Sequence, residues 1–309
     1  MSDDRESYRI VIVGEVLADC FEDGSEIIGG APLNVAWNLR GFGFDPLMVS
    51  AVGDDDLGRE ILASMESFGL RTDGVQRVGD KMTGRVNVTL EDGEPTYDIV
   101  RDVAYDHVDP QTAAMATGHY HGGDGRMTLY HGTVAARAGT RDAINRLKSE
   151  GDPRVFFDIN VREGNFDASW LDELMRGVDV LKCNWDEMRM LIDDGGSIDA
   201  SDADAVVDRA GRYVDDSNLS GCVLTAGADG AYHVGRGNSV TRAETPNVPP
   251  DDFKDAVGAG DALASVVIAA LCGGVAPETA LPAAVEHAAR VCTLRGATTE
   301  NKSFYRLEF

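Results

Sequence analysis

Short, unbroken apolar runs alternate with amphipathic segments along this chain, and this alternation limits the possible folds more than any other feature. Four of the runs are typical of strands buried on both faces of a sheet: residues 8–14, 46–53, 154–160 and 178–184. The segments 34–43 and 57–70 between them carry helical patterns. We therefore expect an α/β fold with a mainly parallel central sheet and helices on both of its faces.

Two other segments, residues 17–30 and 84–100, alternate polar and apolar residues around turns. This pattern indicates β-hairpins rather than crossover helices, and the second hairpin turns at "DGE". We expect the two hairpins to pair as a small antiparallel sheet that projects from the main body. This β-lid, at about residues 16–30 and 81–106, is expected to be an insertion in one domain spanning residues 1–309.

The composition argues against several classes of binding partner. A formal net charge of −25 argues against nucleic acid and against an anionic membrane surface. The longest apolar stretch, residues 262–271, is too short to span a bilayer, and the charged N-terminus is unlike a signal peptide. Five cysteines without a C-x-x-C pair predict reduced thiols in a cytoplasm. The acidity fits either adaptation to high salt or an ordinary acidic enzyme.

Polar residues gather where the predicted strands end, and ligands of open parallel sheets bind beyond those ends. The residues in question are Glu15, Asp19, Asp158, Asn160, Arg162, Lys182, Asn184, Glu187, Thr225, Gly227 and Gly230. Each alone has an ordinary explanation as a helix cap or a turn, but together they favour a binding site. No dinucleotide-binding G-x-G-x-x-G follows the first strand, and no P-loop motif occurs. His119 and His121 have no other ligand at metal-binding spacing.

The stretch "DAVGAGDALASVV", residues 255–267, places an aspartate where a glycine-rich turn starts an apolar helix. The unpaired N–H groups of such a turn favour an anion. Asp261 either caps this helix or accepts a proton beside a bound phosphate. The helix dipole is expected to keep its carboxylate ionised, which suits a base.

The chain resembles the ribokinase-like (PfkB) carbohydrate kinases over nearly its full length, and most of all their fructokinase branch. "GGAPLNVAWNLRGFG" at 29–43 and "DAVGAGDALASVV" are similar to the two signatures of that family. Shorter matches follow in family order: "VGDDDLGREI", "FFDINVR", "LKCNWDE" and "LTAGADGAY". The resemblance implies a three-layer α/β/α sandwich with a β-lid. It also implies transfer of the γ-phosphoryl group of ATP to a sugar hydroxyl, with Mg²⁺ bound to the nucleotide.

The resemblance also implies a role for each site residue. Asp261 is the expected general base, and the N–H groups of residues 257–260, including Gly258, Ala259 and Gly260, are the expected anion hole. The expected sugar-binding residues are Asp19, Gly30, Asn34 and Arg162, although Arg162 has a pairing with Asp158 as its alternative. The expected nucleotide-binding residues are Asn184, Thr225, Gly227 and Gly230. Glu187 is expected to hold Mg²⁺ through water, and Asp255 a monovalent cation such as K⁺.

Three substitutions depart from the family pattern: Ala256 in place of threonine, Leu263 in place of phenylalanine, and Gly41 in place of an aliphatic residue. Ala256 weakens the expectation of a monovalent-cation site. The favoured acceptor is a hexose, with fructose first, while ribose, 2-keto-3-deoxygluconate and nucleosides stay open. A non-catalytic sugar or nucleotide sensor is the alternative from another class. A homodimer formed through the lid is the expected assembly.

Overall fold

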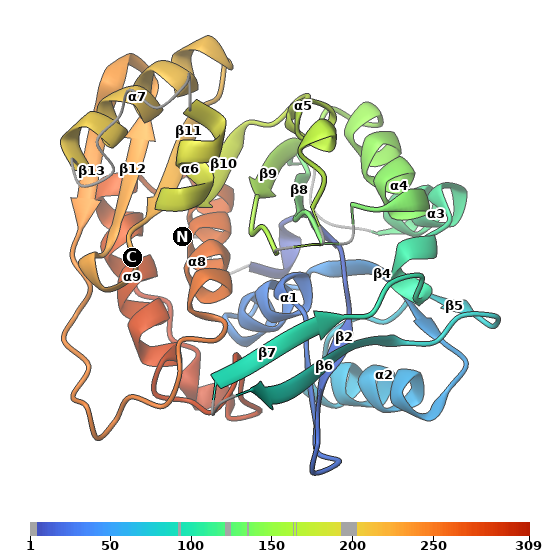
Figure 1. The fold of residues 1–309 in the computed structure, drawn as a ribbon. Helices are drawn as coiled ribbons and strands as arrows, with labels where there is room; N and C mark the ends of the chain where they lie inside the picture. Colours follow the sequence, from blue (N-terminus) through green and yellow to red (C-terminus); the bar gives the residue numbers. More distant parts are fainter. Residues whose placement is uncertain are drawn as a thin grey trace.

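Nine strands form the central sheet of the computed structural model, which describes residues 5–91, 94–120, 125–134, 136–162, 164, 166–192 and 203–309 (Figure 1). Their order across the sheet is β13 (Ser239–Ala243), β12 (Ala231–Gly235), β11 (Gly221–Thr225), β10 (Val180–Asn184), β9 (Arg154–Asp158), β8 (Thr128–His131), β1 (Ile10–Val13), β4 (Leu47–Gly53) and β5 (Val75–Val78). Neighbouring strands from β11 to β5 pair in parallel, and β12 and β13 continue the sheet antiparallel. The predicted parallel sheet is therefore confirmed.

Helices cover both faces of this sheet because its strands are apolar on both sides. On β1, Ile10 and Ile12 pack into one core while Val11 and Val13 pack into the other. The first core contains α1 (Ala31–Gly41), α2 (Asp56–Phe68), α8 (Ala259–Gly273) and α9 (Pro277–Val291). The second lies under α3 (Pro110–His119), α4 (Ala138–Ser149), α5 (Leu171–Met175), α6 (Trp185–Ile192) and α7 (Ala203–Asp216). This arrangement is the expected three-layer sandwich.

None of the helices in the described part of the chain combines the length and the apolar character needed to cross a bilayer. His119 is the last residue of α3, and His121 lies outside the described residues. Gly41 also has a structural explanation, because a Cβ atom there would lie 2.2 Å from the ring of Tyr305.

The lid is a second sheet with the order β3 (Glu26–Gly29), β2 (Leu17–Phe21), β6 (Gly84–Glu91) and β7 (Glu94–Ile99). Figure 1 shows β6 and β7 running beside the main body, near α1 and α2. Each hairpin is antiparallel, as expected, but the two hairpins join through a parallel pairing of β2 with β6. The pairing is parallel because both strands leave the main body at the same end, where Leu17 lies opposite Gly84.

Candidate active site

Asp261 lies in the first turn of α8 and is only 8% exposed. Its Oδ2 accepts a hydrogen bond of 2.8 Å from Nδ2 of Asn34, a buried residue in the first turn of α1. The turn before the helix requires glycine at 258, because its φ is +78° and a Cβ atom there would lie 2.3 Å from Cβ of Ala297. The two family signatures therefore meet at one carboxylate.

The amides of this turn are only partly available. The N–H groups of Gly258, Gly260 and Asp261 have no hydrogen-bond partner among the described residues. By contrast, Val257 N–H donates to Oδ1 of Asp255 over 2.8 Å, and Ala259 N–H donates to the carbonyl of Ala256 over 3.2 Å. The anion hole that the geometry offers is thus three amides at 258, 260 and 261, in place of the continuous run 257–260 expected from the sequence.

Asp255 fastens the turn to the C-terminal segment. Its Oδ2 accepts from the N–H of Gly296 over 3.1 Å while its Oδ1 holds Val257. The neighbouring N–H of Lys254 donates to the carbonyl of Cys292. Both oxygens of the Asp255 carboxylate therefore accept hydrogen bonds from backbone N–H groups. The sequence around Asp255 did not reveal this structural role.

A buried ion pair lies beneath the first turn of α8. Nζ of Lys182, in the middle of β10, is 2.8 Å from both carboxylate oxygens of Asp158, at the end of β9. A Cβ atom added to Gly260 would lie 3.3 Å from the same Nζ, so the ammonium group is next to the turn. Lysine, and not the alternative Arg162, is the partner of Asp158.

Burial dominates the electrostatics of Asp261. It raises the pKa of this carboxyl from 3.8 to about 6, although the Asn34 hydrogen bond and the charges of Lys182 and Arg162 act in the opposite direction. The negative charge of Asp158 adds to the rise. Loss of hydration therefore outweighs the groups that favour the ionised carboxylate. A pKa near 6 nevertheless leaves a base that is ionised at pH 7.

Asn184 and Glu187 form a reciprocal cap at the start of α6. Oδ1 of Asn184 accepts from the N–H of Glu187 over 2.9 Å, and Oε2 of Glu187 accepts from the N–H of Asn184 over 2.8 Å. Oε1 of Glu187 accepts from the N–H of Val161 over 2.7 Å. Burial raises the pKa of Glu187, which is 6% exposed.

These bonds restrict what Glu187 can do for a metal ion. Each carboxylate oxygen keeps a second lone pair for a water molecule, which fits contact with Mg²⁺ through water. Within the described ranges, no group of three or more His, Cys, Asp or Glu side chains is placed to hold a metal ion. A bound Mg²⁺ would therefore take most of its ligands from nucleotide phosphates and water, and the residues present fit that arrangement.

The loop after β11 needs its glycines for conformational reasons. Gly227 has a φ of +57° and Gly230 a φ of +103°, and a Cβ atom at Gly230 would lie 2.0 Å from the carbonyl oxygen of Ala243. Thr225 precedes this loop at the end of β11, and its hydroxyl donates to the carbonyl of Cys183. The geometry explains a tight turn, and it leaves Thr225 on the same sheet edge as Asn184.

The expected sugar-binding residues come from the lid, from α1 and from the loop after β9. Asp19 is a half-buried residue of β2, and the pKa of its carboxyl is raised by burial and lowered by the charge of Arg162. Gly30 caps α1 with a φ of +111°, and its carbonyl accepts the N–H of Asn34. Arg162 is exposed and its charge acts on both Asp19 and Asp261. Two members of the set, Asn34 and Arg162, therefore act directly on Asp261.

One acidic residue at this edge was noticed in the sequence but received no role there. Glu15 follows β1, is 4% exposed, and has an Oε2 atom without a partner among the described residues. Burial raises its pKa from 4.5 to about 7. The signal available in the sequence was its position at the end of the first strand.

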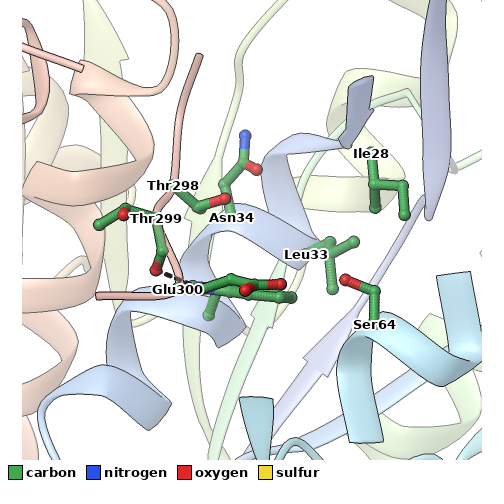
Figure 2. Close-up of a pocket in the computed structure, with 8 residues that line it drawn as sticks. Ile28, Leu33, Asn34, Ser64, Thr298, Thr299 and Glu300 are labelled. Carbon is green, nitrogen blue, oxygen red and sulfur yellow. Dashed lines mark hydrogen bonds between the residues drawn. The ribbon is translucent and has the colours of Figure 1, made fainter. Parts of the chain in front are cut away.

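A cavity of about 140 Å³ lies on the other side of Asn34 (Figure 2). Its lining residues are Ile28, Leu33, Asn34, Trp37, Ser64, Thr298, Thr299 and Glu300. In Figure 2 the amide of Asn34 points away from Leu33 and Ser64. The amide of Asn34 bonds to Asp261, which is not among the residues that line the cavity. We therefore place the candidate chemistry at Asp261 and not in this cavity.

Comparison with known proteins decides the family. The model described as "pfkB family carbohydrate kinase" matches residues 9–303. The chain belongs to the PfkB family of carbohydrate kinases. This PfkB chain is therefore an ATP-dependent sugar kinase, with the ribokinase-like fold expected from its sequence.

Individual relatives are distant and differ in their named acceptors. The chain is 25% identical to an ATP-dependent 6-phosphofructokinase of Thermoanaerobacterium thermosaccharolyticum, over 88% of this chain and 84% of the relative. It is 23% identical to a 2-dehydro-3-deoxygluconokinase of Dickeya dadantii, over 94% and 96%. The solved structure of a fructokinase with bound ATP from Xylella fastidiosa is similar with a TM-score of 0.77 and 20% identity, covering 97% and 96% of the two chains.

Proposed function

We propose that this PfkB kinase transfers the γ-phosphoryl group of ATP to a hydroxyl of a hexose, with fructose as the first candidate. The observation that carries the proposal is the buried carboxylate of Asp261, held by Asn34 beside three unpaired amides of one helix N-terminus. A proton acceptor and an anion site in contact are what phosphoryl transfer to an alcohol requires.

In the proposed reaction Asp261 takes the proton of the sugar hydroxyl as that oxygen forms its bond to the γ-phosphorus. The bond between the γ-phosphorus and the bridging oxygen breaks, and the electron pair leaves on ADP. The N–H groups at 258, 260 and 261 donate to the negative oxygens of the phosphoryl group in transfer. Asn34 fixes the orientation of the Asp261 carboxylate through its 2.8 Å hydrogen bond.

On the nucleotide side, Asn184, Thr225, Gly227 and Gly230 are assigned to ATP. Mg²⁺, when bound with the nucleotide, neutralises phosphate charge. Glu187 is assigned to orient the water ligands of that ion, with the free lone pairs that its backbone contacts leave. Asp255 holds the turn, and a monovalent cation beside it stays part of the proposal.

The acceptor side rests on Asp19, Gly30, Asn34 and Arg162. A nucleoside acceptor would need an aromatic platform in the lid, and Tyr97 and Tyr105 are the only aromatic residues at 96–106. This acceptor loses support because Tyr105 is fully buried. Its hydroxyl accepts a 2.9 Å hydrogen bond from Arg137. The side chain of Tyr97, the other tyrosine, lies outside the described residues. Ribose and 2-keto-3-deoxygluconate stay as the alternative acceptors.

A coupled ADP-release assay over a sugar panel tests this proposal. We expect turnover with fructose at a kcat of about 1 to 100 s⁻¹, a typical kinase rate, and lower kcat/KM for ribose, 2-keto-3-deoxygluconate and nucleosides. Higher kcat/KM with another sugar would correct the acceptor but leave the kinase chemistry. ATP binding without turnover of any sugar would favour a sensor.

We also propose a homodimer that forms through the lid. One face of the lid sheet packs Val86 and Val88 against Tyr105, whereas Ile27 of β3 is 38% exposed. A second copy of the lid would cover this exposed edge. We expect light scattering to give twice the chain mass of 33.0 kDa, and the chain mass itself would contradict the dimer.

A cytoplasmic location completes the proposal. All five cysteines are free thiols, and buried Cys183 and Cys222 lie with their sulfur atoms 3.8 Å apart, too far for a disulfide. Free thiols in proximity are typical of a reducing compartment.

A further inference from the structure

Glu15 is enclosed beside the acceptor residues. A Cβ atom added to Gly30 would lie 3.3 Å from Cγ of Glu15 and 2.7 Å from its carbonyl oxygen. Gly30 in turn starts the helix that carries Asn34. A buried carboxylate oxygen without a hydrogen-bond donor is costly, so this group keeps a proton until the pH approaches neutrality.

The charged and titratable groups around Glu15 come from several elements. They are Asp261 on α8, Arg162 after β9, Arg137 before α4, Tyr105 in the 3-10 turn Ala104–His107, and Tyr130 on β8. Both tyrosines stay neutral in the physiological range, because burial raises their pKa values. Arg137 is bonded to Asp106 and Tyr105. The groups that remain to set the charge at the acceptor site are Glu15, Asp261 and Arg162, with Asp19 from the lid.

Arg162 is the cation that a negatively charged acceptor would have to use. Its charge already lowers the pKa of three carboxyl groups, namely Glu15, Asp19 and Asp261. The other nearby cation, the ammonium group of Lys182, is bound to Asp158. A sugar carboxylate would therefore compete with protein carboxylates for Arg162, and the competition grows when Glu15 loses its proton.

Resting on the proposed kinase function, we propose that Glu15 is a specificity-determining residue of the acceptor site. Its ionised form disfavours sugars that carry a carboxylate and leaves neutral sugars unaffected. The preference for a neutral acceptor over an acid sugar therefore increases as the pH rises through the range in which Glu15 loses its proton. Replacing the carboxyl by a neutral amide of the same shape removes this pH dependence.

The test compares kcat/KM for D-fructose with kcat/KM for 2-keto-3-deoxygluconate between pH 5.5 and 8.5, at constant ionic strength. In the wild type we expect the ratio to rise about tenfold across this range, which corresponds to an interaction of one pKa unit. In Glu15→Gln we expect a flat ratio at the low-pH value. Both sugars react only with the enzyme form in which Asp261 is ionised, so the ionisation of Asp261 cancels in the ratio of the two kcat/KM values. Glu60→Gln, on the exposed face of α2, is the matched control and should behave as the wild type.

The outcomes separate this proposal from the proposed function. If another neutral sugar replaces fructose as the best acceptor, the ratio is measured with that sugar, and only the fructose assignment fails. If no sugar is turned over, the ratio is taken from equilibrium dissociation constants of the two sugars. The contribution of Glu15 is then the part of the rise that Glu15→Gln removes, because the charge of Asp261 does not cancel in dissociation constants. A flat ratio in the wild type, or an unchanged rise in Glu15→Gln, overturns the role of Glu15. Infrared difference spectra of wild type minus Glu15→Gln must also show a protonated carboxyl at pH 5.5, and its absence overturns the proposal independently.

Discussion

Replacing Asp261 by asparagine is expected to lower kcat by about 10² to 10⁴ while the Kd for ATP changes little. Asparagine has the same shape, and its side-chain oxygen can still accept the hydrogen bond from Asn34. What it loses is the ability to take a proton from the sugar. Steady-state kinetics of the sugar that gives the highest turnover, together with calorimetric titration of ATP, measures both quantities.

The same substitution should make the protein more stable above pH 6. The folded-state pKa of Asp261 is about 6 against 3.8 for an unperturbed carboxyl, so the buried charge costs stability once the pH rises through 6. Asparagine carries no charge. The melting temperature of the Asp261→Asn variant should therefore exceed that of the wild type at pH 8 but not at pH 4. Asp252→Asn, in the exposed loop before the turn, is the control and should leave kcat unchanged. Turnover that survives Asp261→Asn would show that another group is the base.

The wild-type kcat should follow the same titration. The base form of Asp261 predominates above pH 6, so kcat is expected to fall below that pH with a limb near 6. The Asp261→Asn variant should lose turnover, gain stability at high pH and lose the acid limb of kcat. This combination distinguishes a catalytic carboxylate from a helix cap, because removing a cap lowers stability.

The sequence predicted the layers of the fold because its signals for strands and helices are local. Runs such as residues 8–14 are apolar on both faces, and their burial in a parallel sheet follows from that alone. The lid hairpins were equally visible from their turns. The parallel join of β2 with β6 was not, because the pairing of two hairpins is a long-range choice set by where each leaves the main body.

The site was predictable in its members but not in their contacts. The strand-end residues do gather at one edge, and Asn34 and Asp261, 227 positions apart, do bond to each other. Which cation pairs with Asp158 depends on the register of β9 and β10, which places Lys182 opposite it. The pKa of Asp261 could not be derived either, because it is set by how completely distant segments exclude water.

Replacing Lys182 by methionine is expected to destabilise the fold by about 3 to 5 kcal/mol, because it leaves the buried carboxylate of Asp158 without its partner. It should also move the acid limb of kcat upward by about one pH unit, since the charge that lowers the pKa of Asp261 disappears while that of Asp158 remains. Thermal unfolding and the pH profile of kcat measure the two effects on the same sample.

The double variant Lys182→Met with Asp158→Asn separates stability from chemistry. It removes both charges, so no unpaired ion stays buried and most of the lost stability should return. The acid limb should return toward 6, because the opposite influences of Lys182 and Asp158 on Asp261 are removed together. If the double variant is stable and has its limb near 6 but keeps a kcat below that of the wild type, the ammonium group of Lys182 acts on the transferred phosphoryl group itself. The Nζ atom of Lys182 lies 3.3 Å from the position of a Cβ atom at Gly260. A kcat equal to that of the wild type, together with a limb near 6, would instead assign Lys182 a positioning role through Asp261.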